Sequence, residues 1–251
     1  PEARKDKEGQ VLALRATVKL NLDEMEMAVP LMREALDNLH PENTGIRSVV
    51  TLDLADVSLA ADDVPEALRL YRSALAAAQP SGNIMISVNA MSKLARLQAM
   101  QGQLHAAAES YHASLETLRS QGADDVPVTG MLEEGITRLL YEWNDLDNAR
   151  RHGERALALL RRWGHAQHIA STMIALARIA HAAGLETRAQ AMSRLDKTIA
   201  HCRQHNLRYP EQQAMEAQAR FALLEGNLDR ARELYERTAQ RFPQAYAYGA
   251  G

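Results

Sequence analysis

Apolar residues in this chain recur at steps of three and four, the spacing that places them on one face of an α-helix. Two series show the pattern most clearly: Leu68, Tyr71, Leu75 and Ala78, and Ala108, Tyr111, Leu115 and Leu118. No stretch with the alternating pattern of a half-buried β-strand is evident. The pattern therefore predicts a chain built from helices.

The helical series repeat with a period close to 40 residues. Six alanines mark the repeat at spacings of 39, 40, 42, 40 and 42 residues: Ala28, Ala67, Ala107, Ala149, Ala189 and Ala231. Five residues before each alanine stands a residue that tolerates the left-handed backbone of a tight turn: Asp23, Asp62, Gly102, Asn144, Gly184 and Gly226. Each unit is thus predicted to contain a first helix, a short turn and a second helix.

Small residues accompany the repeat alanines on both sides. They stand twelve positions before each alanine, at Ala16, Ala55, Ala95, Thr137, Ala177 and Ala219. Most units also have a small residue seven positions after the alanine, which would let the two helices approach closely. The fifth unit has Asp196 there instead, so we expect this unit to be degenerate.

These marks set the expected helix boundaries. The first helices are expected at about 8–20, 46–60, 85–100, 128–142, 167–182 and 211–225, and the second helices at about 24–39, 64–79, 104–120, 146–162, 187–204 and 228–241. Pro30 predicts a shifted start or a kink in its helix. Four further prolines are expected to break the chain between units: Pro41, Pro80, Pro127 and Pro210.

A single hairpin cannot bury its apolar face, but stacked neighbours bury a continuous core. We therefore expect an all-α fold, an α-solenoid of about six antiparallel helix hairpins that forms one array over residues 1–251. Its units are expected at about 8–41, 46–80, 85–122, 128–164, 167–206 and 211–243. The order Ala95-Gly102-Ala107-Tyr111-Ser114 resembles the tetratricopeptide repeat, whose usual length is about 34 residues. That resemblance implies a right-handed superhelix with the first helices along a concave groove.

Composition narrows the class of protein. The 251 residues are 46% hydrophobic at a net charge of −3, which favours a packed core over disorder, and 4% aromatic, which disfavours a β-sandwich. No uncharged apolar run approaches the length of a membrane span. The single cysteine, Cys202, excludes an internal disulfide and suits the cytoplasm. The 29 basic and 32 acidic residues offer no general electrostatic attraction for nucleic acid.

The chain shows none of the phosphate-binding, nucleophile or zinc-protease motifs that mark common enzymes. The nearest approach to a metal site is His201-Cys202-x-x-His205, with two histidines one helical turn apart. Zinc needs a third and usually a fourth protein ligand, so polar residues on an exposed helix end are the favoured interpretation. We expect a non-catalytic chain without a metal or cofactor of its own.

A column of arginines is the strongest candidate for a binding surface. Eleven residues before the repeat alanine, four consecutive units carry an arginine: Arg96, Arg138, Arg178 and Arg220. Guanidinium groups facing the groove could bind carboxylate or phosphate in a bidentate manner. For Arg138 and Arg220 the alternative is an ion pair within the helix, because Glu134 and Glu216 precede them by four residues.

Aromatic residues concentrate beside this column. Tyr141 follows Arg138 by three residues on the predicted groove side, and Trp143 stands at the turn of the same hairpin. An aromatic ring beside charged groups suits stacking on a sugar or heterocycle. Both residues could equally form a packing plug between repeats.

The segment Leu-Leu-Tyr-Glu-Trp-Asn-Asp-Leu-Asp at 139–147, with Ala149 and Ala156-Leu157-x-Leu159, resembles the helical region of MalT-type regulators. These are large, ATP-dependent transcriptional activators of the LuxR family. The resemblance implies a sensor that receives an inducer or partner proteins and releases a state blocked from oligomerising. It also implies an N-terminal nucleoside-triphosphatase module, which would hold ATP, and a C-terminal helix-turn-helix; both are missing from these residues. No ligand-binding residue transfers from the family.

Two functions fit these observations best. The first is the sensor and protein-interaction array of such a regulator, which binds a small-molecule inducer or a protein, with an anionic group suiting the arginines. This fragment itself would bind neither nucleic acid nor membrane, and oligomerisation is open to it. The second is an independent tetratricopeptide-like scaffold that binds a peptide. A third hypothesis, an unrecognised enzyme, would need a deep pocket in which histidine and carboxylate groups of perturbed pKa converge. The missing initiator methionine favours an internal segment of a longer protein.

Overall fold

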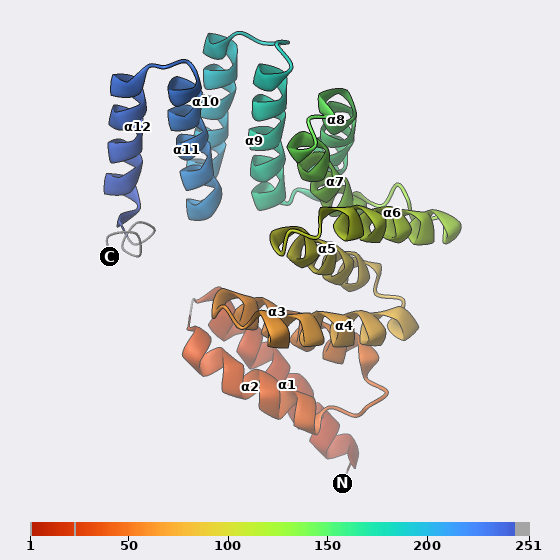
Figure 1. Ribbon diagram of the computed structural model, residues 1–251. Helices are drawn as coiled ribbons and strands as arrows, with labels where there is room; N and C mark the ends of the chain where they lie inside the picture. Colours follow the sequence, from red (N-terminus) through yellow and green to blue (C-terminus); the bar gives the residue numbers. More distant parts are fainter. Residues whose placement is uncertain (1, 23, 244–251) are drawn as a thin grey trace. The chain divides into compact units, whose positions relative to one another are not determined.

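The computed structural model describes residues 2–22 and 24–243, and helices make up nearly all of them (Figure 1). In chain order they are α1 (Glu2–Asn21), α2 (Met25–Asn38), α3 (Thr44–Ala60), α4 (Val64–Ser81), α5 (Ile84–Met100), α6 (Leu104–Ser120), α7 (Gly130–Glu142), α8 (Leu146–Trp163), α9 (Ala166–Ala182), α10 (Arg188–Gln204), α11 (Arg208–Leu224) and α12 (Leu228–Arg241). A short 3₁₀ turn, η1 (Pro127–Thr129), precedes α7. No strand occurs within the described ranges.

The twelve helices confirm the all-α prediction and its period. Apart from the start of α1, which lies at Glu2 rather than near residue 8, each helix end falls within three residues of its expected place. The odd-numbered helices are the predicted first helices, and the even-numbered helices are the second ones.

The predicted turns within the hairpins have the backbone that their residues favour. Asp62, Gly102, Asn144, Gly184 and Gly226 all have positive φ, between 58° and 78°. Asp23, which holds this position in the first unit, lies outside the described residues. In three hairpins the next residue caps the second helix, because the side chains of Asp63, Asp145 and Asn227 accept hydrogen bonds from backbone N–H groups of the first turn. Each turn thus ends one helix and starts the next.

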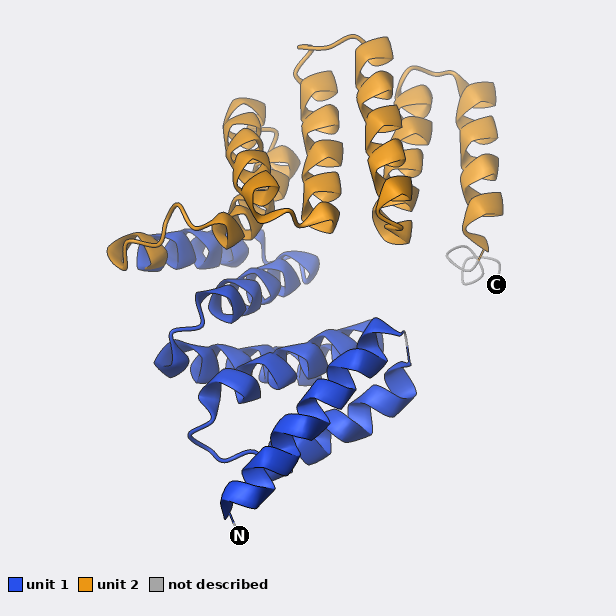
Figure 2. Cartoon of the chain, turned by 180° about the vertical axis from the view of Figure 1, so that it is seen from behind, with its two compact units in different colours: residues 1–117 blue, residues 118–251 orange. Residues whose placement is uncertain are grey.

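The helices divide into two compact units, residues 1–117 and 118–251, with the boundary inside α6 (Figure 2). In unit 1, α1 packs on α2 and α3 on α4, while α1, α3 and α5 contact one another in order. In unit 2, α7 packs on α8, α9 on α10 and α11 on α12, while α9 contacts both α7 and α11. Within each unit the first helices therefore form one layer.

Small residues lie where these helices meet. The repeat alanines Ala28, Ala67, Ala107 and Ala149 are fully buried, as are Ala55, Ala95, Thr137 and Ala177 of the first helices. Because the side chain of alanine is short, the backbone of the neighbouring helix can approach closely and pack without leaving a cavity. The spacing of small residues in the sequence is therefore the spacing of the helix contacts.

The expected degeneracy of the fifth unit is wrong. Ala189 is exposed, and the buried alanine is Ala191, because the turn is two residues longer. Thr187, which caps α10, lies three residues after Gly184, whereas the cap of α12 directly follows Gly226. The shift places Thr198 rather than Asp196 at the next buried position, so the unit keeps the pattern of its neighbours.

Two prolines differ from expectation. Pro80 and Pro210 were expected between helices, but Pro80 lies in the last turn of α4 and Pro210 in the first turn of α11. A proline in the first turn costs little, because its N–H would have no acceptor within the helix. Pro30 lies inside α2 and does not shift its start, which remains at Met25, so a kink at this residue stays a prediction. Burial of Ala28 and Met32 on either side holds that helix against its missing hydrogen bond. Pro41 and Pro127 lie between helices as predicted.

Substitution at Gly9 tests the close contact of α1 with α2. A Cβ atom at Gly9 would lie 2.7 Å from the backbone nitrogen of Leu39 and 3.1 Å from the carbonyl oxygen of Ala35. We expect Gly9→Ala to lower the free energy of unfolding by about 1–3 kcal/mol, because backbone must move. The matched control is Gly45→Ala in α3, where an added Cβ meets nothing within 4 Å. We expect this substitution to raise the free energy of unfolding by up to about 1 kcal/mol. Thermal unfolding of both variants measures the difference, and equal melting temperatures would contradict it.

Asp53 of α3 gives the stability of the protein a defined pH dependence. Burial, and after it the nearby carboxylate of Asp56, raise the pKa of Asp53 to about 6. The pKa in the folded state thus exceeds that of the unfolded chain, so folding is favoured while Asp53 is protonated, and stability falls as the pH rises from about 4 through 6. Asp53→Asn removes this titration. We expect the variant to melt above the parent at pH 7.5, with a smaller gap at pH 4.5; a gap independent of pH would refute the assignment.

Candidate ligand pocket

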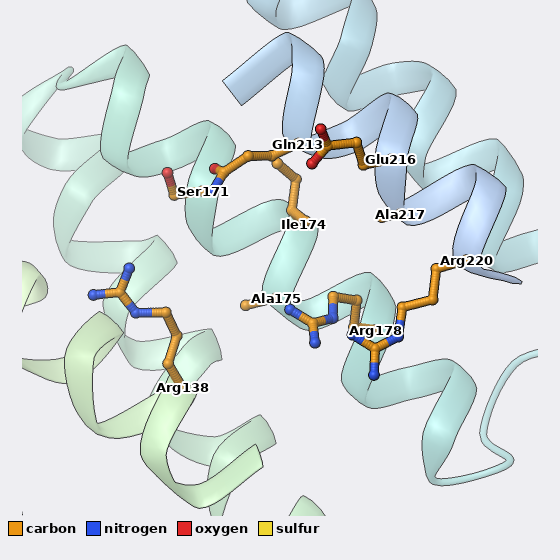
Figure 3. A pocket seen from close by; sticks show the side chains of 9 residues that line it. All are labelled: Arg138, Ser171, Ile174, Ala175, Arg178, Gln213, Glu216, Ala217 and Arg220. Carbon is orange, nitrogen blue, oxygen red and sulfur yellow. The ribbon is translucent and has the colours of Figure 1, made fainter. Parts of the chain in front are cut away.

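Three arginines of the predicted column line one pocket in unit 2. Arg138 of α7, Arg178 of α9 and Arg220 of α11 surround a cavity of about 210 Å³, with Ser171, Ile174, Ala175, Gln213, Glu216 and Ala217 as the other lining residues. In Figure 3 Arg220 extends toward α9, the head group of Arg178 points along the pocket toward Ala175, and Arg138 reaches in from α7. The three residues share one position in the repeat, so the contacts of α9 with α7 and α11 bring their side chains to the same cavity.

Arg178 is held most firmly. Its guanidinium carbon lies 4.5 Å from the centroid of the Tyr141 ring, a cation–π contact between α9 and α7. Its Nε is buried and has no hydrogen-bond partner. A buried donor without a partner costs about 1–3 kcal/mol, so an acceptor entering the pocket would recover stability here.

Of the two intrahelical ion pairs that were the alternative, the pair of Arg138 with Glu134 forms, whereas the described residues show no pair of Arg220 with Glu216. Arg138 lies 3.6 Å from Glu134, as its spacing suggested. Glu134 is buried and lies 2.6 Å from Nδ1 of His168, so Arg138 shares this carboxylate with α9. No salt bridge of the described residues joins Glu216 to Arg220, and Glu216 accepts a hydrogen bond from Gln212. Arg220 is thus an exposed guanidinium at the pocket edge.

The fourth arginine lies in the other unit. Arg96 belongs to α5 of unit 1, and its charge acts on the buried hydroxyl of Tyr71. Tyr71 donates a hydrogen bond to Asp56, which also pairs with Lys93 at 2.7 Å. Asp56 holds in the second hairpin the repeat position that arginine holds in unit 2. The same position therefore builds a charge-balanced cluster in unit 1.

The two aromatic candidates have different environments. Tyr141 is half-buried, and its ring contacts Arg178 although Tyr141 does not itself line the pocket. Trp143 follows the last residue of α7, is 39% exposed and does not line the pocket. The structure thus gives Tyr141 a packing partner in Arg178 and leaves much of the Trp143 surface open.

A second glutamate of α7 was not singled out from the sequence. Glu133 is buried and lies 2.6 Å from Nδ1 of His152 and 3.2 Å from Nε of Arg155, both on α8. Glu133 and Glu134 thus tie α7 to both α8 and α9. Two adjacent acidic residues on a helix with many apolar residues are the signal that could have indicated these buried pairs.

Other candidate sites are less suited to chemistry. A hollow of about 860 Å³ in unit 1 is lined largely by apolar side chains of α1 and α3, including Val11, Leu14 and Val49. The rings of His201 and His205 lie 4.5 Å apart, and Nε2 of His201 is 3.3 Å from the carbonyl oxygen of Ala166. Cys202 is buried, and burial raises the pKa of its thiol to about 11. Within the described residues no three His, Cys, Asp or Glu side chains are placed to hold a metal ion, and no helix is long and apolar enough to cross a membrane.

A family model described as a MalT-like TPR region matches residues 9–249 of this chain. The chain is 26% identical over 162 residues to the HTH-type transcriptional regulator MalT of Vibrio cholerae, and 27% identical over 173 residues to that of Vibrio campbellii. These matches cover 64% and 69% of this chain but 18% and 19% of the regulators. The chain thus spans about a fifth of the length of these relatives.

Solved structures show the same fold at low sequence identity. Aspartyl phosphate phosphatase F from Bacillus subtilis matches with a TM-score of 0.73 and 11% identity, over 94% of this chain and 60% of that one. A Rap protein complexed with competence and sporulation factor matches with a TM-score of 0.67 and 16% identity, over 90% and 61% of the two chains. A Podospora anserina kinesin light chain with TPR-like repeats matches at 0.51 and 19%, over 83% and 99%. These likenesses establish the TPR-like solenoid fold.

Proposed function

This chain belongs to the family of MalT-like TPR regions, and on that premise we propose that it is the sensing array of a MalT-like transcriptional regulator of the LuxR family. An inducer or partner protein binds in the arginine-lined pocket and thereby controls activation. The observation that carries this proposal is the convergence of Arg138, Arg178 and Arg220 from three successive hairpins on one cavity.

The position of the pocket suits a sensor. A ligand there would touch α7, α9 and α11 together, so its binding energy would depend on how these three helices lie against one another. A ligand shifts an equilibrium between two arrangements only by the difference in its affinity for them. Contacts to three repeats at once are a direct source of such a difference.

ATP binding and DNA binding by such a regulator would belong to other parts of a longer chain. ATP would bind an N-terminal module and DNA a C-terminal helix-turn-helix, while these 251 residues bind neither and catalyse no reaction. The buried, weakly acidic thiol of Cys202 suits the reducing cytoplasm in which such a regulator would work. Ligand binding would release an array that is then able to oligomerise.

A second candidate is a stand-alone scaffold that binds a peptide or protein. The similarity of fold to a Rap protein complexed with competence and sporulation factor supports it, because that protein combines a similar fold with a bound factor. The sequence that flanks these residues in the gene separates the two candidates. A P-loop upstream and a helix-turn-helix downstream favour the sensor, and neither module favours the scaffold.

Removal of the two pocket arginines that make no salt bridge tests the proposal. A thermal-shift screen of sugars, nucleotides and peptides identifies a ligand by the rise in melting temperature. We expect the double variant Arg178→Gln and Arg220→Gln to weaken binding of that ligand at least tenfold. The matched control is Arg161→Gln with Arg237→Gln, which removes the same charge from exposed positions of α8 and α12. Equal affinity of both double variants would remove the pocket from the proposal.

The proposed coupling between repeats has a separate test. Small-angle scattering of the chain should differ with and without the ligand found in the screen, because that ligand would favour one arrangement of neighbouring hairpins. Arg178→Gln with Arg220→Gln should abolish the difference at the same ligand concentration. Superimposable profiles of the free and saturated protein would argue against a switch and leave a static binding surface.

A further inference from the structure

The charges in the unit 2 pocket are not balanced. Three guanidinium groups, those of Arg138, Arg178 and Arg220, face a single lining carboxylate, that of Glu216. Arg138 already shares Glu134 with His168, so the excess positive charge is concentrated on Arg178 and Arg220. Both side chains lie in the same part of the cavity (Figure 3), and two like charges there repel one another unless an anion binds with them.

The pocket walls strengthen any such attraction. Ile174, Ala175 and Ala217 line the pocket beside the two arginines, and charges interact more strongly next to apolar groups than in bulk water. Arg178 contributes a buried Nε without a partner and is kept in place by the face of Tyr141. A fork of guanidinium donors fixed in advance suits the oxygens of a phosphate or carboxylate.

The volume of the cavity and the chemistry of the two anions show which anion fits the pocket better. The cavity of about 210 Å³ is smaller than the roughly 300–1,000 Å³ of pockets that enclose a whole drug-sized molecule, so it suits one group of a larger ligand. A carboxylate brings one negative charge, whereas a phosphate monoester brings nearly two at neutral pH. Glu216 offsets part of the charge of Arg178 and Arg220, but neither arginine makes a salt bridge within the described residues. The three acceptor oxygens of a phosphate can accept hydrogen bonds from both guanidinium groups, whereas a carboxylate has two oxygens.

We infer that this pocket binds the phosphate monoester group of a small ligand, with Arg178 and Arg220 as its direct ligands and Tyr141 as the residue that positions Arg178. The inference rests on the proposed function, since it names the chemical class of ligand for the same site. Arg138 and Ser171 border the cavity and would contact the rest of the ligand.

Methyl phosphate, dimethyl phosphate and acetate are the probes that test it, by calorimetric titration of the 251-residue chain at constant ionic strength. We expect methyl phosphate to bind at least tenfold more tightly than either monoanion. Its affinity should fall between pH 7.5 and 5.5, as the ester takes up its second proton near pH 6. Equal binding of the three anions, or none for methyl phosphate, would overturn the inference.

Substitutions in the pocket test which residues bind methyl phosphate. Arg178→Gln and Arg220→Gln should each weaken methyl phosphate binding at least tenfold, while Arg161→Gln with Arg237→Gln leaves it unchanged. Arg178→Lys keeps the positive charge but not the planar guanidinium group, so it should bind methyl phosphate more tightly than Arg178→Gln and less tightly than the parent. This intermediate affinity would show that the loss in Arg178→Gln does not come from misfolding. Tyr141→Phe should bind as the parent and Tyr141→Leu should bind less tightly, because only the ring supports Arg178. Affinity independent of Arg178 and Arg220 would refute the assignment.

The two proposals fail separately. If methyl phosphate does not bind but a sugar or peptide binds in a manner that needs Arg178 and Arg220, the phosphate inference is wrong and the sensing pocket stands. If methyl phosphate binds through these arginines but no binding partner alters the scattering of the chain, the inference stands and the switch does not.

Discussion

The close approach of helices at small residues is the constraint on which the rest of this structure depends. Ala28, Ala67 and Ala149 are fully buried where second helices pack, and Gly9 leaves no room for a Cβ against the backbone of Leu39. Contacts of this kind fix each hairpin and leave the first helices to contact those of the next hairpin. They also explain the scarcity of aromatic residues, because large side chains would hold these helices apart.

Charged groups buried between the hairpins add a second constraint in unit 2. Glu133 joins α7 to α8 through His152 and Arg155, and Glu134 joins α7 to α9 through His168. A buried carboxylate is stable only with its partners in place, so these pairs favour one register of α7 against its neighbours. That register is the one that turns Arg138 toward the cavity lined by Arg178 and Arg220.

The repeat position eleven residues before the repeat alanine has different surroundings in the two units. In unit 1 it holds Thr17, Asp56 and Arg96, and Asp56 is neutralised by Lys93 and hydrogen-bonded by Tyr71. In unit 2 it holds three arginines with fewer carboxylates to balance them. The residues around this position, and not the shared backbone, thus decide whether it contributes to a charge-balanced cluster or lines a pocket with guanidinium groups. This difference places the candidate site in unit 2.

The sequence by itself determined the helices, their turns and the period, because each depends on local properties: apolar spacing along a helix, and residues such as Asn144 and Gly102 that accept positive φ. It also placed the arginines at one repeat position. It misjudged the fifth unit, because a two-residue longer turn is visible only when burial distinguishes Ala191 from Ala189. Tertiary structure alone decided that Arg178 rests on Tyr141, that Glu134 meets His168 and that three arginines share one cavity. These contacts join residues from different hairpins, and their geometry depends on how the helices pack rather than on any local pattern.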